Sequence, residues 1–140
     1  MAFMNQAKKK IIAELVKPIL KKYNLKGSLS VKHYSSIVLT LKSGKIDFIK
    51  NYNDNAIEKN QSISEWQRKK DSIDVNYMQV NEFYINENYT GIAREALNAL
   101  KSALQGADWY DKSEIQEDYF DIAYYIDINI GKYDQGYIVE

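Results

Sequence analysis

Apolar and polar residues alternate along the stretch FDIAYYIDINI, residues 120–130. Its even positions carry Phe, Ile or Tyr, and its odd positions carry Asp, Ala, Tyr and Asn. A period of two is typical of a strand that buries one face and leaves the other wet. Because the stretch is about twice the usual strand length, the pattern predicts a long central strand that is twisted or bent.

Two other segments have the apolar periodicity of helices. Residues 5–23 place Ile, Leu and Val on one face and charged side chains on the opposite face. Pro18 lies inside this pattern and is expected to kink the helix or mark a restart, because it has no N–H to donate. Residues 90–105 form the second predicted helix, with Thr90 as its N-cap and Gly106 just beyond its end.

After the first helix, the pattern of residues 28–49 predicts a three-stranded meander. Its strands alternate apolar and polar residues, with turns at Tyr34–Ser36 and at Ser43–Gly44. Ile46 and Phe48 alternate on the short third strand. Short connections of this kind favour antiparallel pairing.

The remaining segments are less regular. Residues 50–74 are predicted to be an irregular polar insertion, with capping-box spacing for a short helix at Ser62–Lys70. Imperfect alternation suggests a strand at residues 75–86, and a last short strand is expected at Tyr137–Val139. The order of elements predicts one α+β domain over residues 1–140. In it, an antiparallel sheet of about five strands carries two main helices packed on one face.

The net charge is zero, but the charges are unevenly distributed. Residues 1–70 contain 15 Lys and Arg against 5 Asp and Glu, whereas residues 71–140 contain 4 against 14. Such asymmetry is typical either of two halves that neutralise each other on folding or of separate basic and acidic surfaces. Cys is absent, which excludes disulfides and thiolate metal sites and fits a reducing cytoplasm. No apolar run is long enough for a transmembrane helix, so no membrane partner is expected.

Catalytic and cofactor-binding patterns are missing from the sequence. His33 is the sole histidine and alternates with Leu29 and Val31, which predicts a structural rather than a catalytic role. No phosphate-binding glycine motif occurs, and one His without Cys is a poor donor set for zinc. Asp121 and Asp127 share one strand face but stand about 20 Å apart, too far for a glycosidase pair. The sequence therefore predicts a protein that is not an enzyme and uses no cofactor or metal.

Tyrosine and carboxylate side chains gather around the predicted long strand. Tyr supplies apolar area with a hydrogen-bonding tip and is enriched at interfaces. Carboxylates beside such rings suit a basic partner surface, although the same residues also fit a Tyr-filled sheet with a solvated acidic face. The candidate partner-binding residues are Tyr110, Asp111, Glu114, Glu117, Asp118, Asp121, Tyr125 and Asp127.

The basic N-terminal half offers an alternative surface. Lysines on the polar face of the first helix, together with a basic run near residue 69, have the charge needed to follow phosphates. A solvated basic helix face explains the same residues, because few aromatic rings are interleaved with them. The candidate nucleic-acid-binding residues are Lys10, Lys17, Lys21, Arg68, Lys69 and Lys70.

Most of the chain resembles a known family. The segments NEFYINENYTGIAREALNAL and DYFDIAYYIDINIGKYDQGYIV, with the hairpin VKHYSSIVLTLKSGKIDF, are similar to a large polyvalent-protein-associated domain of phages and plasmids. Residues 50–74 have no counterpart in that pattern, and the resemblance implies no catalytic residue. The matching residues are Asn88, Tyr89, Gly91, Tyr119–Tyr125, Ile128–Gly131, Tyr133 and Asp134.

Polyvalent proteins of mobile elements are associated with entry of DNA into the cell and with blunting host defences. The resemblance therefore implies an anti-defence protein that acts in the cytoplasm of a host bacterial cell as a non-enzymatic inhibitor. Its expected partner is a host nucleic-acid enzyme, such as a CRISPR effector or a restriction enzyme. Because a fold does not fix its function, the alternative is a small nucleic-acid-binding module. A homodimer is compatible with either function.

Overall fold

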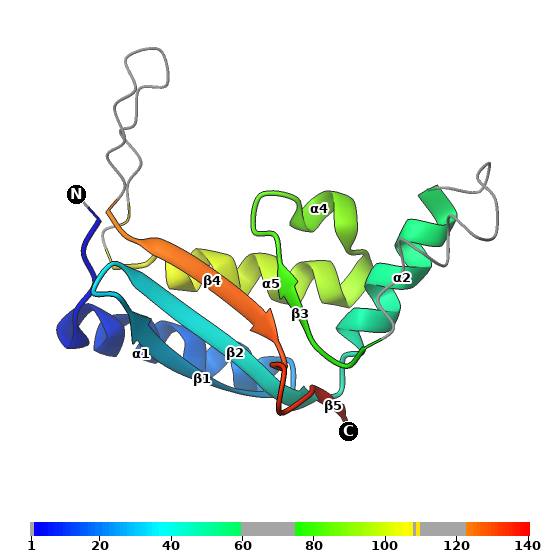
Figure 1. Ribbon diagram of the computed structural model, residues 1–140, viewed down its shortest axis with the longest axis horizontal. Helices are drawn as coiled ribbons and strands as arrows, with labels where there is room; N and C mark the ends of the chain where they lie inside the picture. Colours follow the sequence, from blue (N-terminus) through cyan, green and yellow to red (C-terminus); the bar gives the residue numbers. More distant parts are fainter. Residues whose placement is uncertain (1, 60–74, 108, 110–122) are drawn as a thin grey trace, which may run out of the picture.

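The computed structural model describes residues 2–59, 75–107, 109 and 123–140 (Figure 1). The elements follow in this order: α1 (Gln6–Lys22), β1 (Leu25–Lys32), β2 (Ser36–Gly44), α2 (Phe48–Lys59), β3 (Met78–Val80), α4 (Ile85–Asn88), α5 (Gly91–Leu104), β4 (Tyr125–Ile130) and β5 (Ile138–Val139). Over these residues the strands form one five-stranded sheet. Helices combined with this sheet give the predicted α+β fold.

The sheet is mixed, which corrects the prediction of an antiparallel sheet. Its strand order is β1-β2-β4-β3, and β5 pairs with the end of β2. The pairs β1–β2 and β3–β4 are antiparallel, but β2 runs parallel to both β4 and β5. Parallel neighbours need a long connection, and the chain between β2 and β4 supplies one that includes α2, α4 and α5. Periodicity identifies strands but carries no information about their relative directions.

The strand β4 lies between β2 and β3, at the centre that the alternation predicts (Figure 1). Tyr125 is exposed and Asp127 is half-buried. The buried even positions are Ile126, Ile128 and Ile130. A central strand with its even face in the core is therefore confirmed for this part of the pattern. The described strand begins at Tyr125, and residues 120–122 lie outside the described ranges.

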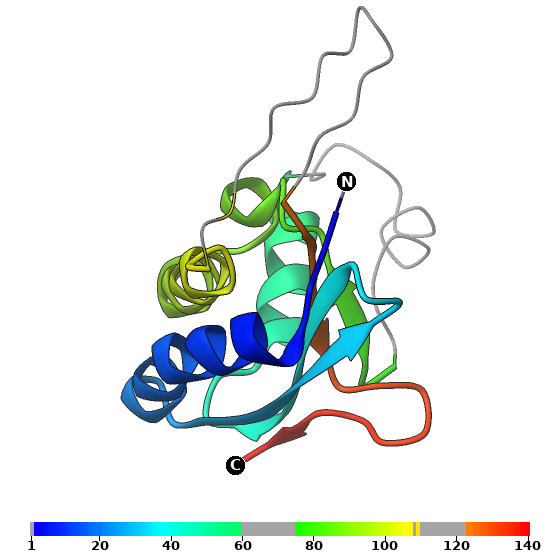
Figure 2. The same cartoon turned by 90° about the vertical axis from the view of Figure 1, so that its left-hand side faces the viewer.

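The helix α1 packs against β1 and against α5, which also contacts β4. Figure 2 shows the two helices lying next to each other beside the strands. That both pack on one face of the sheet stays a prediction. The helix α1 continues through Pro18 without a break, so the predicted restart is wrong. Glu14, whose carbonyl loses its N–H partner, is exposed, so water can satisfy that carbonyl.

The predicted third strand of the meander is wrong. The strand β2 ends at Gly44, and α2 begins at Phe48. The Asp47 carboxylate accepts a hydrogen bond from the Lys50 N–H at 3.1 Å, which is the geometry of a helix N-cap. Ile46 and Phe48 are both buried. Two alternating apolar residues do not distinguish a short strand from a buried turn that leads into a helix.

The first part of the predicted polar insertion is helical and holds the chain before α5. Asn51, on α2, donates from its amide to Thr90 O and to Thr90 Oγ1, each at 3.2 Å, and accepts from the Thr90 N–H at 2.9 Å. One turn later, the Asn55 amide donates to the Glu87 carbonyl at 2.7 Å. Thr90 is the N-cap residue of α5, but its hydroxyl accepts from Asn51 and does not cap the helix.

The other irregular segments follow the predictions only in part. Residues 60–74, with the short helix proposed at Ser62–Lys70, lie outside the described residues. Within the strand proposed at residues 75–86, only Met78–Val80 is extended and paired. The chain then turns into the short helix Ile85–Asn88. Imperfect alternation therefore overestimated the length of this strand.

Candidate partner-binding surface

Three chain segments meet at one end of the sheet: the residues before α1, the tip of the β1–β2 hairpin and the start of β4. Backbone hydrogen bonds join them. The bonds run from Phe3 N to Ala123 O at 2.8 Å, from Met4 N to Tyr34 O at 2.7 Å and from Tyr125 N to Ser35 O at 2.9 Å. Segments that are far apart in the sequence thus form one continuous surface.

The hairpin tip has an unusual backbone. His33 and Tyr34 both have a φ of 55°, and the Ser35 N–H donates to Lys32 O at 3.2 Å. Two consecutive left-handed residues closed by such a bond define a type I′ turn, for which Asn-Gly is the usual sequence. An L-residue with a side chain costs about 1–2 kcal/mol in this region. Tyr34 is the clearer outlier, since His adopts the conformation more readily.

Four ring side chains project from this end of the sheet: Phe3, His33, Tyr34 and Tyr125, which we call the aromatic end. The exposed fraction is 51% for Phe3, 80% for Tyr34 and 47% for Tyr125, and His33 is also exposed. Exposed rings are frequent at interaction sites, because each ring buries a large area when a partner covers it. A strained turn and exposed rings at the same place mark the aromatic end as a candidate partner-binding surface.

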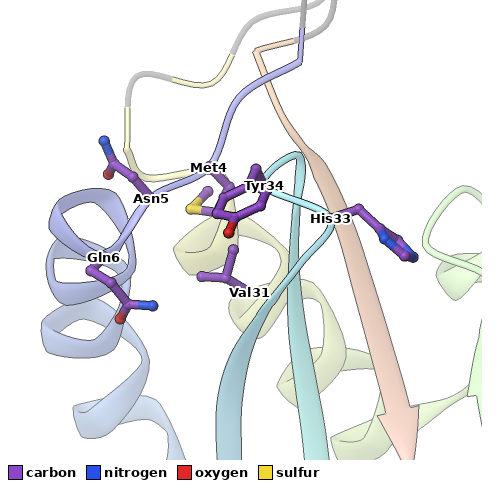
Figure 3. Close-up of a pocket in the computed structure, with 6 residues that line it drawn as sticks. All are labelled: Met4, Asn5, Gln6, Val31, His33 and Tyr34. Atoms are coloured by element: carbon purple, nitrogen blue, oxygen red, sulfur yellow. The ribbon is translucent and has the colours of Figure 1, made fainter.

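A hollow of about 430 Å³ opens beside the aromatic end. In Figure 3 the Tyr34 ring points toward Met4 and Val31, whereas His33 points to the other side of the turn. The lining residues are Met4, Asn5, Gln6, Val31, His33 and Tyr34. The volume falls within the range of ligand pockets, and the amides of Asn5 and Gln6 place hydrogen-bonding groups at its edge. A side chain of a partner fits such a hollow.

Lys8 anchors the aromatic end to the body of the protein. Its Nζ donates to Phe3 O at 3.2 Å and lies 5.4 Å from the centroid of the Phe3 ring and 5.6 Å from that of Tyr124. The buried Tyr124 hydroxyl donates to Leu104 O at 2.6 Å and accepts from Ala107 N at 3.2 Å. These contacts fix the surface to the start of α1 and the end of α5. A surface held in this way loses less entropy when it binds.

Tyr125 also belongs to the open face of the sheet. The strand register places Lys32, Ser36 and Tyr125 in one row across the sheet, followed by Ser30, Val38 and Asp127 in the next row. The Asp127 Oδ1 accepts from Gln79 Nε2 at 3.5 Å, which is a weak bond. Charges of both signs therefore stand within two rows, Lys32 in one and Asp127 in the other.

The structure brings two of the predicted partner-binding residues together, because Tyr125 and Asp127 stand on the same face of β4. The others lie outside the described residues: Tyr110, Asp111, Glu114, Glu117, Asp118 and Asp121. For the nucleic-acid alternative, Lys10, Lys17 and Lys21 are all exposed on α1, where their spacing places them on one side of the helix. Arg68, Lys69 and Lys70 fall among the residues that are not described.

Of the four residues of the aromatic end, the sequence predicts only Tyr125 as a partner-binding residue. His33 lies in the exposed turn and not on the apolar face of β1, so its predicted position beside Leu29 and Val31 is wrong. Phe3 and Tyr34 were not among the candidates. The turn predicted at Tyr34–Ser36 begins one residue too late, because His33 and Tyr34 are its central residues and Ser36 already belongs to β2. Neither central position is Gly or Asn, and this was the available indication of strain.

Two buried tyrosines have altered acidity for structural reasons. Burial raises the pKa of the Tyr89 and Tyr137 hydroxyls well above the ordinary value, and the charge of Asp47 adds to the effect at Tyr137. The Tyr137 hydroxyl donates to Ile46 O at 2.7 Å, and that of Tyr89 contacts the Met78 sulfur at 3.7 Å. Both hydroxyls stay neutral at physiological pH and act as internal hydrogen-bonding groups.

Among residues 2–59, 75–107, 109 and 123–140, no three His, Cys, Asp or Glu side chains gather closely enough to hold a metal ion. In the same ranges, no helix combines the length and the apolar character needed to span a membrane. The described residues thus form an α+β protein with exposed aromatic side chains at one end of its sheet, which is a candidate interaction surface. No family model, curated protein or solved structure matches this chain. The resemblance to the polyvalent-protein-associated domain therefore stays a prediction.

Proposed function

We propose that this protein is a non-enzymatic inhibitor that binds a host nucleic-acid enzyme, such as a CRISPR effector or a restriction enzyme, through its aromatic end. The observation that carries the proposal is the turn at His33 and Tyr34. It combines an unfavourable backbone with a His33 side chain that is exposed and a Tyr34 side chain that is 80% exposed. Selection for stability alone favours Asn-Gly at such a turn. The presence of two rings at this turn is explained if they contact a partner.

The class of partner is supported by charge and by the resemblance. Proteins that grip DNA present Arg and Lys to its phosphates. Carboxylates next to Tyr rings suit such a surface, because charge-assisted hydrogen bonds to Arg are strong and directional. Tyr125 and Asp127 stand on one face of β4 and are the described part of this arrangement. The second half of the chain, with 14 Asp and Glu against 4 Lys and Arg, supplies the remaining negative charge.

Many of the residues that carry the resemblance have a structural role where they are described. Half of the described ones are buried, and Gly91 and Gly131 have positive φ. The buried ones are Tyr89, Ala123, Tyr124, Ile128, Ile130 and Gly131. The shared pattern therefore supports a common fold more than a common site. This is why we base the binding surface on Tyr34 and its neighbours and use the resemblance only for the class of partner.

The test is capture of a partner from a nuclease-treated bacterial lysate by the tagged protein, followed by identification of bound proteins by mass spectrometry. The Tyr34→Ala, Tyr125→Ala double variant removes two exposed rings of the aromatic end. Loss of rings at the centre of an interface is expected to lower capture at least about tenfold. The matched control is Tyr133→Ala, because Tyr133 is 87% exposed and lies beyond the opposite end of β4.

Two results would contradict the proposal. Equal capture by the double variant and by the Tyr133→Ala control would remove the aromatic end as the binding surface. Consistent capture of proteins that do not act on nucleic acids would remove the proposed class of partner, even if the aromatic end were needed for binding. Thermal melts of each variant establish that the fold is intact in both comparisons.

A second function is favoured by one observation: Lys10, Lys17 and Lys21 are exposed on one side of α1. We propose as the alternative that this side binds nucleic acid. A gel shift with single- and double-stranded DNA should then show binding that weakens steeply between low and physiological salt. Reversal of the three charges by Lys→Glu substitutions should abolish the shift. Absence of any shift at low salt would rule out the alternative.

A further inference from the structure

An apolar groove of about 320 Å³ runs between α1 and β1, away from the aromatic end. Val16 and Leu39 are buried and form its floor, and half-buried Leu20 lines its α1 side. Lys9 and Lys17 also line the groove from α1. An apolar floor with cationic groups on one side suits a ligand that is itself apolar in the middle and anionic at both ends.

The groove lies along an edge strand. Within the described residues, β1 pairs with β2 and with no other strand. An edge strand presents backbone N–H and C=O groups to its open side, and an extended segment of another protein can pair with them. Lys32 is exposed near one end of β1 and adds positive charge at that edge. Lys26, near the other end, pairs with Glu140 at 3.4 Å, so its charge is already matched within the chain.

We propose that this edge and the groove beside it bind an extended segment of a partner protein in which an apolar residue has an acidic residue two positions before it and another two positions after it. Lys9 and Lys17 are eight residues apart on α1, a distance of about 12 Å at 1.5 Å per residue. Positions i and i+4 of a strand share a face and lie about 13 Å apart. Figure 1 shows α1 running alongside β1, so the two spacings correspond.

The match assigns one role to each position of the bound segment. The two carboxylates meet Lys9 and Lys17, and the apolar side chain between them enters the groove. The intervening residues point to the other side of the added strand and are unconstrained in sequence. The apolar contact supplies affinity, and the pair of charges fixes the register, because a shift by one residue would place all three side chains on the wrong face.

Two other occupants fit this surface less well. A second copy of β1, paired antiparallel about Leu29, would place Lys26 of one chain opposite Lys32 of the other, and like charges in facing positions are destabilising. A nucleic acid would satisfy the lysines but leave the apolar floor at Val16 and Leu39 without a matching group. The charge pattern therefore favours an acidic–apolar–acidic strand.

The experiment titrates the full-length protein with two synthetic peptides and follows backbone amide resonances by NMR. The first peptide is Thr-Glu-Thr-Ile-Thr-Glu-Thr, and the matched control replaces both Glu by Lys. The first peptide should shift the amides of β1 and the adjacent face of α1. The control peptide should bind at least about tenfold more weakly, because attraction at two positions is replaced by repulsion.

Charge-reversal variants sharpen the test. The Lys9→Glu, Lys17→Glu variant should weaken binding of the Glu peptide about tenfold and should strengthen binding of the Lys peptide. The Lys10→Glu, Lys21→Glu variant changes the net charge of α1 equally, at exposed positions on the same side of the helix as Lys17 that do not line the groove, so it should have a smaller effect than the first variant. If only the Lys9→Glu, Lys17→Glu variant prefers the Lys peptide to the Glu peptide, loss of folding cannot be the cause, because an unfolded protein would bind neither peptide.

A second pair of variants tests the groove itself. Ala13→Phe places a ring in the space between α1 and β1, because Ala13 lines the groove, whereas Ala7→Phe changes an exposed position on the same helix outside the lining. Only Ala13→Phe should abolish binding of the Glu peptide, with melting temperatures recorded for both variants. Binding that survives Ala13→Phe would remove the groove from the proposal.

Several outcomes would overturn the inference. These are equal affinities for the two peptides, amide shifts away from β1, and equal losses in the two charge-reversal variants. A concentration-dependent dimer that the Lys9→Glu, Lys17→Glu variant disrupts would identify a second copy as the occupant. Displacement of the Glu peptide by a short oligonucleotide at equal concentration would identify a nucleic acid. None of these readouts depends on Tyr34 or Tyr125, so they are separate from the test of the proposed function.

Discussion

The two ends of β4 meet the same backbone requirement in opposite ways. Beyond its last residue, the chain turns at Gly131, where φ is 67°. A Cβ there would lie 2.5 Å from Tyr137 N and 2.9 Å from Asn76 O, so only glycine fits. At the start of β4, the neighbouring hairpin tip also needs positive φ, but His33 and Tyr34 occupy it, both at 55°.

The difference separates a glycine that packing requires from a strained turn that packing does not explain. The Gly131 end is part of the core, since Tyr137 packs edge-on against Phe48 with ring centroids 5.8 Å apart and donates to Ile46 O. Among the described residues the His33–Tyr34 end faces solvent, and Tyr34 leaves 80% of its surface exposed, so packing there gives little advantage to a ring over Asn-Gly. We therefore interpret the strained turn as the consequence of presenting two rings to a partner.

The largest expected effect concerns β4 itself, because the comparison requires a central strand with one buried face. Ile126 is 6% exposed, and an unpaired carboxylate at that position costs several kcal/mol, comparable with the total of about 5–15 kcal/mol for a typical domain. Ile126→Asp should therefore unfold the protein. Asp127→Ser, on the open face, should change stability by less than about 1 kcal/mol. Thermal melts decide the matter, and equal losses would contradict the assignment of the two faces.

The next effect tests the Gly131 end. Gly131→Ala adds both a left-handed L-residue and a clash with backbone atoms, and about 3 kcal/mol or more should be lost. Gly91→Ala is a matched control, because Gly91 also has positive φ, 57°, but nothing lies within 4 Å of the added Cβ. Its loss should be limited to about 1–2 kcal/mol. Denaturant unfolding measures both, and similar losses would mean that packing at Gly131 does not distinguish this end.

The sequence predicts the elements whose period is long and regular. The apolar face of α1, the helix after Thr90 and the alternation through Ile126 and Ile128 all have a repeat that only one backbone conformation satisfies. Each of these segments has the predicted type in the structure. Their ends are less well predicted, because the side chain of Asp47 ends the strand pattern locally and begins α2.

The candidate site was less predictable because it depends on contacts between distant segments. The parallel pairing of β2 with β4 sets Tyr125 beside the hairpin tip, and no local pattern encodes that direction. In the sequence Asn51 resembles a residue of a polar loop, and its role becomes visible only in the hydrogen bond that it accepts from the Thr90 N–H. Tyr34 is recognisable only when its φ is known. Side chains that act through tertiary contacts leave little trace in a local repeat.

The last prediction isolates the backbone of the strained turn from its ring. Tyr34→Gly and Tyr34→Ala both remove a side chain that is 80% exposed, so neither loses much packing. Gly adopts a φ of 55° without a steric penalty, whereas Ala at this φ still has the penalty of an L-residue in the left-handed region. Tyr34→Gly should therefore be more stable than Tyr34→Ala, and the greater freedom of Gly in the unfolded chain offsets part of this gain. The net difference should be about 1 kcal/mol, which corresponds to a melting temperature about 3 °C higher.

Partner capture from lysate should respond differently, because it depends on the ring and not on the backbone. Both Tyr34 variants should lose capture to the same degree, although one of them is more stable. Equal melting temperatures would mean that the turn is not strained. Full capture by Tyr34→Gly would mean that the ring is not used. In either case the contrast between the two ends of β4 would no longer indicate a binding function.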